Sequence, residues 1–315
     1  MESSYQALTA GCGVADFSNR SRIWVTGADR VQFLHSFCTN DIKRLAIGEG
    51  CEAFLTNHQG KTVGHALVRA QQGDALVLDT SPQQATKLIQ HLEHFVISDR
   101  VEFHDRTLTT GELLVAGKHA PRLLSEIGQG SPTTNLWQHS LQSIAGLSVV
   151  VQKVDYVGED SYFLTTSSED LATVLHALTT AGAVPCDSAS VDAVRIEAGF
   201  PLFGADITDE NLPQEIGRDA QAISFKKGCY LGQETVARID AMGHVNRLLS
   251  RVKFTSADIP DPGTELFTDG KSVGRVTSAC WSPKFGSPLA FAMLRRAQAA
   301  PGTMLASASG QAEVC

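Results

Sequence analysis

The spacing of apolar residues changes near residue 247, and this change limits the folds that the chain can adopt. Before it, apolar side chains repeat at helical spacing in several segments, of which Leu88, Ile89 and Leu92 are an example. After it, short alternating stretches are separated by turn residues such as Asp269-Gly270 and Ser282-Pro283. The first part therefore predicts an α+β structure, and residues 247–315 predict a small β-barrel or β-sandwich.

Two similar strand–helix units are expected before residue 247, because apolar runs of strand length twice precede a helical stripe. The first unit has predicted strands at 22–25, 53–56, 64–69 and 75–79, a helix after Asp29 and a helix that starts at Ser81-Pro82. The second has strands at 147–156 and 162–165 and a helix opened by Ser167. A further helix over 188–199 should end at Gly199, and residues 210–228 read as irregular.

Composition and charge exclude several classes of protein. The 315 residues are 43% hydrophobic and 19% charged, which is typical of a globular chain. Acidic residues outnumber Lys and Arg by 34 to 26, and no basic run is present, so general nucleic-acid binding is disfavoured. The N-terminal residues lack a signal-peptide pattern, and no apolar stretch approaches the ~20 residues that span a bilayer. We therefore expect a cytoplasmic protein without a membrane segment.

The cysteines predict neither a disulfide framework nor a resident metal. No two of the seven form a C-x-x-C pair, so we expect reduced thiols and no stably bound iron–sulfur cluster or zinc ion. The one close histidine pair, His91 and His94, is expected on a solvated or core-edge face of a helix. The cysteines are Cys12, Cys38, Cys51, Cys186, Cys229, Cys280 and Cys315.

The segment Lys226-Lys227-Gly228-Cys229-Tyr230-Leu231-Gly232-Gln233-Glu234 is the strongest chemical signal in the chain. Cys229 follows two lysines, lies between two glycines, and precedes a helix that is expected to begin near Gln233. An ammonium group such as that of Lys227 and the positive end of a helix both favour thiolate, so Cys229 is a candidate functional thiol. A buried small cysteine in a turn is the alternative interpretation.

The K-G-C-Y-x-G-Q-E pattern resembles the signature of the YgfZ-type folate-binding proteins, which are relatives of the glycine cleavage T-protein. The resemblance extends over nearly the whole chain. It includes Val25-Thr26-Gly27-Ala28-Asp29, Thr39-Asn40-Asp41, Ala53-Phe54-Leu55-Thr56 and, in the C-terminal part, Gly274-Arg275-Val276-Thr277-Ser278.

This resemblance implies a T-protein-like ring of ferredoxin-like strand–helix units closed by a C-terminal barrel, with a tetrahydrofolate pocket at its centre. Residues 1–246 would form the folate-binding region, in which one subdomain takes roughly 1–45 with 110–246 and the other takes 46–109. Residues 247–315 would form the barrel. The expected cofactor is tetrahydrofolate or a related folate, and the expected transient partners are iron–sulfur client or assembly proteins.

The resemblance also suggests residues that contact the ligand. Glu210 is the preferred partner of the pterin, because a carboxylate can accept two parallel hydrogen bonds from an aminopyrimidinone edge; a solvated loop acid is the alternative. Arg238 could bind the folate glutamate or pair with Glu234 one helical turn earlier. Glu197 is expected to support the ligand site by orienting Arg195 or a backbone donor. Tyr230, Gly228, Gly232 and Gln233 complete the motif.

One departure separates the chain from the aminomethyltransferases of the same superfamily. Their segment resembling G-G-x-x-D-D carries an acid that acts on the folate nitrogen, whereas this chain has Gly64 and His65 at the acidic positions. Glycine supplies no proton-transfer group, and a strand histidine is more often packed than catalytic. The favoured function is therefore a folate-binding accessory protein for iron–sulfur cluster assembly or repair, with an implied link to tRNA modification and no classical catalysis. The alternative is an aminomethyltransferase-like one-carbon transfer enzyme.

Overall fold

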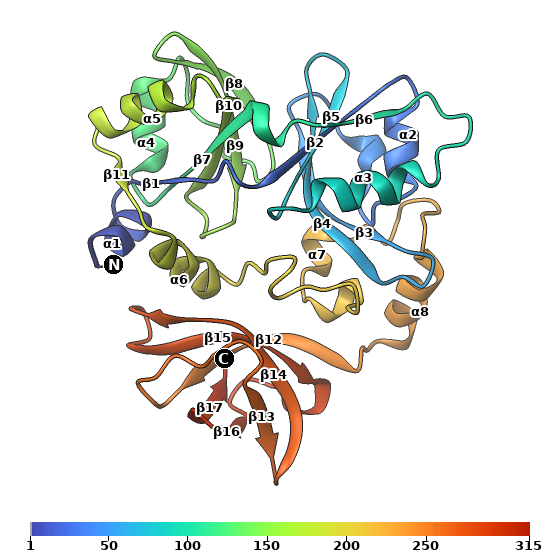
Figure 1. Cartoon of the computed structure of the whole chain (residues 1–315), viewed down its shortest axis with the longest axis vertical. Coiled ribbons are helices and arrows are strands. Elements are labelled where there is room, and N and C mark those ends of the chain that lie inside the picture. The colour runs from blue at the N-terminus through green and yellow to red at the C-terminus, as the bar shows by residue number, and fades with distance from the viewer. Residues whose placement is uncertain (1) are drawn as a thin grey trace.

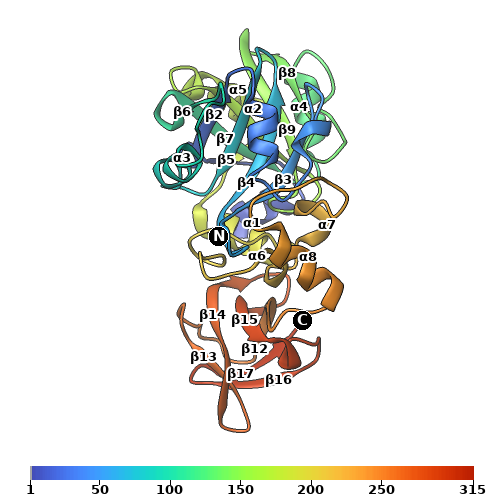
Figure 2. The same cartoon turned by 90° about the vertical axis from the view of Figure 1, so that its right-hand side faces the viewer.

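The computed structural model describes residues 2–315 and places three bodies around a common centre (Figure 1). Two sheet-and-helix bodies, here the first and second lobes, lie side by side, and a β-barrel lies below them. Residues 199–246, here the connecting segment, run between the lobes and the barrel (Figure 2). The mixed α/β fold and the C-terminal barrel predicted from the sequence are confirmed.

The first lobe is built on a six-stranded sheet, covered on one face by α4 (Ala120–Ile127) and α5 (Leu171–Thr180). On the other side lie α1 (Glu2–Thr9) and α6 (Ser188–Ala198), with an aromatic core that includes Phe163 and Phe200. The strand order is β11 (Val184–Pro185), β1 (Gly13–Asp16), β7 (Thr110–Ala116), β10 (Ser161–Ser167), β9 (Leu147–Val154) and β8 (His139–Ile144).

The second lobe is built on a five-stranded antiparallel sheet whose core packs against α2 (Arg30–His35) and α3 (Ala85–Glu93). The short helix η1 (Ile42–Arg44) lies between α2 and β3, and η2 (Thr107–Thr109) lies in the connection from the second lobe to the first. The strand order is β3 (Gly50–Thr56), β4 (Thr62–Gln71), β5 (Ala75–Thr80), β2 (Ser21–Thr26) and β6 (Glu102–Asp105).

The barrel closes through antiparallel pairs, and inward side chains such as Val252, Phe254 and Leu266 fill it. Helix α6 packs on its outer face through Ile196 and Phe291. Its strand order is β12 (Arg247–Phe254), β15 (Ser287–Arg295), β14 (Lys271–Ser282), β13 (Glu265–Thr268), β16 (Met304–Ser307) and β17 (Gly310–Val314), with η4 (Arg296–Gln298) after β15.

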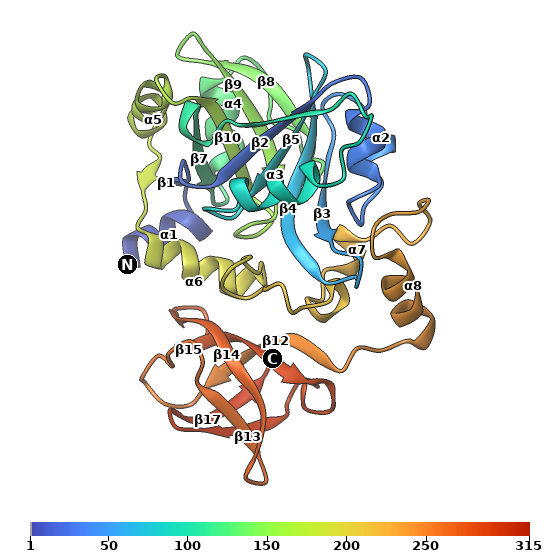
Figure 3. The same ribbon diagram turned by 45° about the vertical axis from the view of Figure 1, so that its right-hand side comes forward.

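Residues 210–228 contain only two short helices, in agreement with the irregular character expected for them, and one longer helix follows. These helices are η3 (Pro213–Glu215), α7 (Asp219–Ala222) and α8 (Gln233–Met242). Figure 3 shows α8 at the outer edge of the molecule, from which the chain turns back into β12.

Two helices start later than their sequence signals predict. Gln83 has a left-handed backbone (φ 63°), so no helix can run from Ser81-Pro82, and α3 begins at Ala85. The cap comes instead from Ser21 on β2, whose hydroxyl accepts hydrogen bonds from the amides of Gln84 (3.0 Å) and Ala85 (3.2 Å). Similarly, Ser167 forms a turn with Asp170, and α5 begins after Asp170.

The sheets divide the chain at different residues from those suggested by the resemblance. Residues 1–45 were grouped with 110–246, but β2 pairs with β5 and β6 and so lies in the second lobe. Only α1 and β1 of the N-terminal part belong to the first lobe. The division of residues 1–246 into two subdomains itself stays a prediction.

A buried group of charged residues joins the two lobes. Arg22 on β2 donates to the Glu112 carboxylate on β7 at 3.1 Å, and Arg20 contacts Asp79 on β5 at 2.6 Å. All four side chains are almost completely buried. Burial and the neighbouring Asp79 raise the pKa of Glu112 to about 7, whereas the Arg20 and Arg22 guanidinium groups outweigh burial and lower the pKa of Asp79.

The raised pKa of Glu112 predicts a pH-dependent stability. In the unfolded chain Glu112 ionises near its ordinary value of 4.5, but in the folded chain it holds its proton up to about pH 7. Glu112 therefore lowers the free energy of unfolding as the pH rises between these two values. Glu112→Gln should become more stable relative to the wild type over this range, by on the order of 1–3 kcal/mol. Urea denaturation at pH 5, 6, 7 and 8 measures this, and a difference that does not change with pH would contradict it.

Candidate functional site

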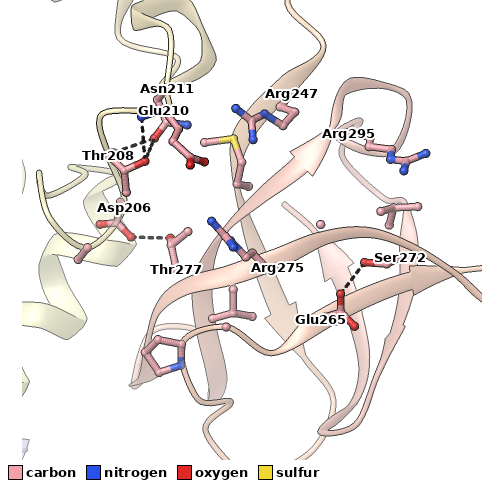
Figure 4. A pocket seen from close by; sticks show the side chains of 17 residues that line it. Asp206, Thr208, Glu210, Asn211, Arg247, Glu265, Ser272, Arg275, Thr277 and Arg295 are labelled. Atoms are coloured by element: carbon pink, nitrogen blue, oxygen red, sulfur yellow. Dashed lines mark hydrogen bonds between the residues drawn. The ribbon is translucent and has the colours of Figure 1, made fainter. Parts of the chain in front are cut away.

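A cavity of about 460 Å³ lies between the connecting segment and the outer face of the barrel (Figure 4). Its walls come from two parts of the chain that are distant in sequence, residues 205–211 and strands β12 to β15. A volume of this size suits a small organic ligand. The polar and charged residues that line it are Asp206, Thr208, Glu210, Asn211, Arg247, Glu265, Ser272, Arg275, Thr277 and Arg295.

Asp206 fixes one wall of the cavity to the barrel. One of its carboxylate oxygens accepts hydrogen bonds from the hydroxyls of Thr277 and Ser278, both at 2.6 Å. The other accepts from Arg195 at 3.1 Å and from the Leu202 amide at 3.0 Å. The buried Asp206 carboxylate is therefore fully used by protein donors and serves to position the wall.

The charged side chains that face the cavity suit a ligand that carries both hydrogen-bond donors and carboxylate groups. Glu210 and the guanidinium groups of Arg247 and Arg275 turn toward the same space (Figure 4). Arg247 also pairs with Glu215 at 3.2 Å, but within residues 2–315 no ion pair involves Glu210, Arg275 or Arg295. The cavity thus combines the carboxylate of Glu210 with guanidinium donors that suit carboxylate groups.

A second charged group lies where both lobes meet the connecting segment, and it is buried. Glu52 on β3 is completely inaccessible and accepts two hydrogen bonds from Arg218, both at 2.5 Å. The Nε2 atom of His65 on β4 lies 2.7 Å from the same carboxylate, and Arg218 also reaches Asp155 at 2.9 Å. Burial opposes ionisation of Glu52, but the hydrogen bonds from His65 and Arg218 outweigh it and lower the pKa of its carboxyl group.

His65 is therefore held in a packed, hydrogen-bonded position. It is 5% exposed, and its ring stacks on Phe54 with the centroids 4.9 Å apart. Neighbouring Gly64 faces α3, where an added Cβ atom would come within 2.5 Å of the Leu88 side chain. A side chain at position 64 would therefore require the Leu88 side chain to move.

The motif residues form an anchored loop with an exposed thiol. Lys227 is buried, and its ammonium group donates to the carbonyls of His35 (2.6 Å), Cys38 (2.5 Å) and Asn40 (2.9 Å) in the second lobe. Burial lowers the pKa of this ammonium group to about 8. Cys229, two residues later, is exposed to solvent. Lys227 therefore fixes the loop, and its predicted influence on the charge of Cys229 stays a prediction.

The structure places the other predicted site residues apart from one another. Glu210 lines the cavity, as a ligand-contacting residue should, whereas Arg238 lies exposed on α8 and does not line it. Within the described residues 2–315, no ion pair joins Arg238 to Glu234. Cys229 is likewise outside the cavity.

Of the two partners expected for Glu197, Arg195 is held by other residues. Asp192 (3.0 Å) and Asp206 (3.1 Å) hold the Arg195 guanidinium group. The buried Glu197 carboxylate accepts from the Tyr5 hydroxyl at 2.8 Å, from the Ser282 hydroxyl and from the Lys284 amide at 3.3 Å. It thus joins α6 to α1 and to the barrel, and of the two expected partners only the backbone donor is present.

Several polar residues of the centre were missed by sequence reasoning. Glu52, Asp155 and Arg218 lie in three separate segments, and only the fold brings them together. A usable signal was present for Glu52, because a charged residue in the middle of an apolar strand requires a buried partner. Glu215 was also missed; it accepts hydrogen bonds from Asn211 (3.2 Å) and Arg247 (3.2 Å) at the edge of the cavity.

Neither a metal-ion site nor a membrane-spanning helix is found within residues 2–315. No group of three or more His, Cys, Asp or Glu side chains gathers there in an arrangement that could hold a metal ion. None of the helices in this range combines the length and the apolar character needed to cross a bilayer.

Two α/β lobes and a C-terminal barrel, with a polar cavity between the barrel and the connecting segment, define a three-body class of α/β protein. Residues 1–227 match the family model described as the GCVT N-terminal domain, and residues 249–312 match the glycine cleavage T-protein C-terminal barrel domain. The chain belongs to the glycine cleavage T-protein family. The superfamily suggested by the sequence motif is thereby confirmed.

Similar proteins include both transferases and a solved structure. A putative chloroplastic transferase of Arabidopsis thaliana is 28% identical over 88% of this chain, which spans 64% of that protein. An aminomethyltransferase of Geobacillus kaustophilus is 27% identical over 96% of this chain and 84% of its own length. The crystal structure of the glycine cleavage system aminomethyltransferase T from Bartonella henselae has a TM-score of 0.87 and 20% identity, and the match covers 99% of this chain and 87% of that one. Because the identity to the Bartonella henselae protein is 20%, this similarity shows a shared fold alone.

Proposed function

We propose that this protein is a YgfZ-type folate-binding accessory factor, which supports the assembly or repair of iron–sulfur clusters in client proteins. The observation that carries this proposal is the anchored loop, which presents the exposed Cys229 thiol on a base held by three hydrogen bonds from Lys227. Tetrahydrofolate or a related folate is the proposed cofactor. Cluster-dependent enzymes of tRNA modification are among the proposed clients, and contact with them would be transient.

The cavity beside Glu210 supplies the proposed folate site. The donor edge of a pterin suits the Glu210 carboxylate, which has no protein ion-pair partner within residues 2–315. The benzoylglutamate end carries carboxylates, and Arg275 on β14 is placed to bind them. We propose Arg275 for this role in place of Arg238, because Arg238 lies outside the cavity.

The thiol is proposed to act by direct, reversible contact. A solvent-exposed cysteine can ligate a cluster on a client or react with an oxidised sulfur species, and neither step requires a cluster to reside on this protein. Bound folate would stabilise the arrangement of the barrel against the connecting segment, because it would contact both walls of the cavity.

Cys229 can be tested against a matched thiol, because Cys229 and Cys315 are both exposed. In a strain that lacks this protein, Cys229→Ser should restore about tenfold less activity of a cluster-dependent enzyme than the wild type does. Cys315→Ser should restore full activity. Tetrahydrofolate binding by calorimetry should be unchanged in both variants. Full restoration by Cys229→Ser would remove this thiol from the mechanism.

The folate site has its own test. Glu210→Gln should weaken tetrahydrofolate binding about tenfold or more, because a charge-assisted pair of hydrogen bonds to the pterin is lost. Glu234→Gln, which changes an exposed acid on α8, is the matched control and should bind like the wild type. Calorimetry measures both, and equal affinity in the two variants would place the folate elsewhere.

The names of the relatives favour a second candidate, folate-dependent aminomethyl transfer. It is less well supported by the residues, since position 64 is glycine and the His65 side chain is committed to Glu52. Incubation with tetrahydrofolate and an aminomethyl donor separates the two. Formation of methylene-tetrahydrofolate that disappears in His65→Ala would favour the transferase.

A further inference from the structure

We propose that a second cleft, between the two sheets at the end remote from the barrel, binds a small organic anion. The cleft has a volume of about 540 Å³ and is lined by parts of β2, β4, β9 and β10. Two arginines, Arg69 and Arg106, face it, and none of its lining residues is acidic.

Arg69 is the reason to expect an anion. Its side chain on β4 is 2% exposed, and its guanidinium group contacts only neutral partners: Thr165 at 3.2 Å, Gln71 at 3.4 Å and Gln152 at 3.5 Å. Within residues 2–315, no carboxylate lies within ion-pair distance of it. A buried cation without a counter-charge is costly to a protein, so such a group is usually paired with an anion.

The charge balance of the surrounding core supports the same conclusion. Three buried guanidinium groups, those of Arg20, Arg22 and Arg69, share two buried carboxylates, Asp79 and Glu112. The carboxylates contact Arg20 and Arg22, which leaves one positive charge uncompensated even when both acids are ionised. That charge belongs to Arg69, which is the member that borders the cleft.

The rest of the cleft defines the class of ligand. Arg106 is exposed at the cleft and has no ion pair within the described residues, so it can be the second contact of an oxyanion. Thr110 and Thr166 add hydroxyl groups, while the half-buried Trp24 and the exposed Leu141 supply an apolar wall. A carboxylate or phosphate group on a flat, ring-sized apolar body fits these features.

This cleft is separate from the proposed folate site. Strand β4 begins at Thr62, whose amide donates to the Asn211 carbonyl beside the barrel cavity. Arg69 lies seven residues further along the same strand, which corresponds to about 23 Å. The proposal therefore does not depend on folate binding.

The test uses the full chain and three simple probes: benzoate, phenyl phosphate and the neutral benzyl alcohol. Calorimetry should show saturable one-to-one binding of at least one of the two anions, and comparison of the anions distinguishes a carboxylate site from a phosphate site. Arg106→Ala and Arg69→Gln should each weaken that binding about tenfold or more. Arg122→Ala, which removes an exposed arginine of α4, should bind like the wild type.

Arg106→Ala keeps the test decisive even if Arg69→Gln folds poorly, because Arg106 is exposed. Saturating anion should also raise the melting temperature of the wild type by more than that of Arg106→Ala. The proposal is overturned if neither anion binds saturably, if benzyl alcohol binds as well as the anions, or if Arg106→Ala binds them with unchanged affinity.

Discussion

Replacing Gly232 with alanine should lower the free energy of unfolding by about 3 kcal/mol or more. Gly232 has a left-handed backbone (φ 82°), and a Cβ atom there would lie 2.4 Å from the Asn57 carbonyl oxygen and 2.7 Å from the Cα atom of Gly60. Both contacts are to backbone of the β3–β4 turn, so no side chain can move aside. The motif glycine thus allows the connecting segment to lie directly against the second lobe.

Gly228, in the same motif, is the matched control for Gly232. It has no left-handed backbone, and an added Cβ atom would have no neighbour within 4 Å. Gly228→Ala should therefore change the free energy of unfolding by no more than about 0.5 kcal/mol. Urea denaturation of the two variants makes the comparison. Equal stability of the two proteins would show that the close approach at Gly232 is not required.

Glu52→Gln should be the most destabilising change at the centre of the molecule, at about 3–5 kcal/mol. The substitution keeps the shape of the side chain but removes the negative charge. That charge accepts two hydrogen bonds from Arg218 and contacts His65. Arg218 would retain only Asp155, which is partly exposed. The loss comes mainly from leaving the buried Arg218 without a full counter-charge.

An exposed ion pair provides the comparison for Glu52. Glu126 pairs with Arg122 one turn earlier on α4, where both side chains are largely in solvent. Glu126→Gln should cost less than about 1 kcal/mol. Chemical denaturation of both variants in one buffer measures the difference. A cost for Glu52→Gln as small as that for Glu126→Gln would mean that the central group does not hold the lobes and the connecting segment together.

Local sequence patterns predicted much of the fold. Alternation of apolar residues located the hairpin of β3 and β4, and Gly199 ended α6 at the expected residue. The start of α3 was misplaced because its cap is Ser21, which lies more than 60 residues earlier in the chain. The sequence patterns also did not predict that β2 pairs with β5 and β6, because packing, and not local spacing, determines the partners of a strand.

The candidate site was less predictable than the fold, since its residues come from distant segments. Glu210 was identified from its motif context and does line a cavity. Arg247 and Arg275 gave no local signal, because barrel strands commonly carry exposed arginines, and only the packing of the barrel on residues 205–211 brings them to the cavity. The partners of Lys227 are backbone carbonyls, which no side-chain pattern can reveal.

The contacts of Lys227 also bear on the order in which the protein is made. Its ammonium group binds carbonyls that precede it by 192, 189 and 187 residues. Contacts of such long sequence separation close late in folding, because a long stretch of chain must be ordered first. A growing polypeptide therefore cannot assemble the Cys229 loop until the second lobe has folded and residue 227 has left the ribosome. The thiol therefore acquires its setting only once residue 227 and the second lobe are both in place, and a chain whose second lobe is unfolded would display a cysteine but not the anchored loop that carries it.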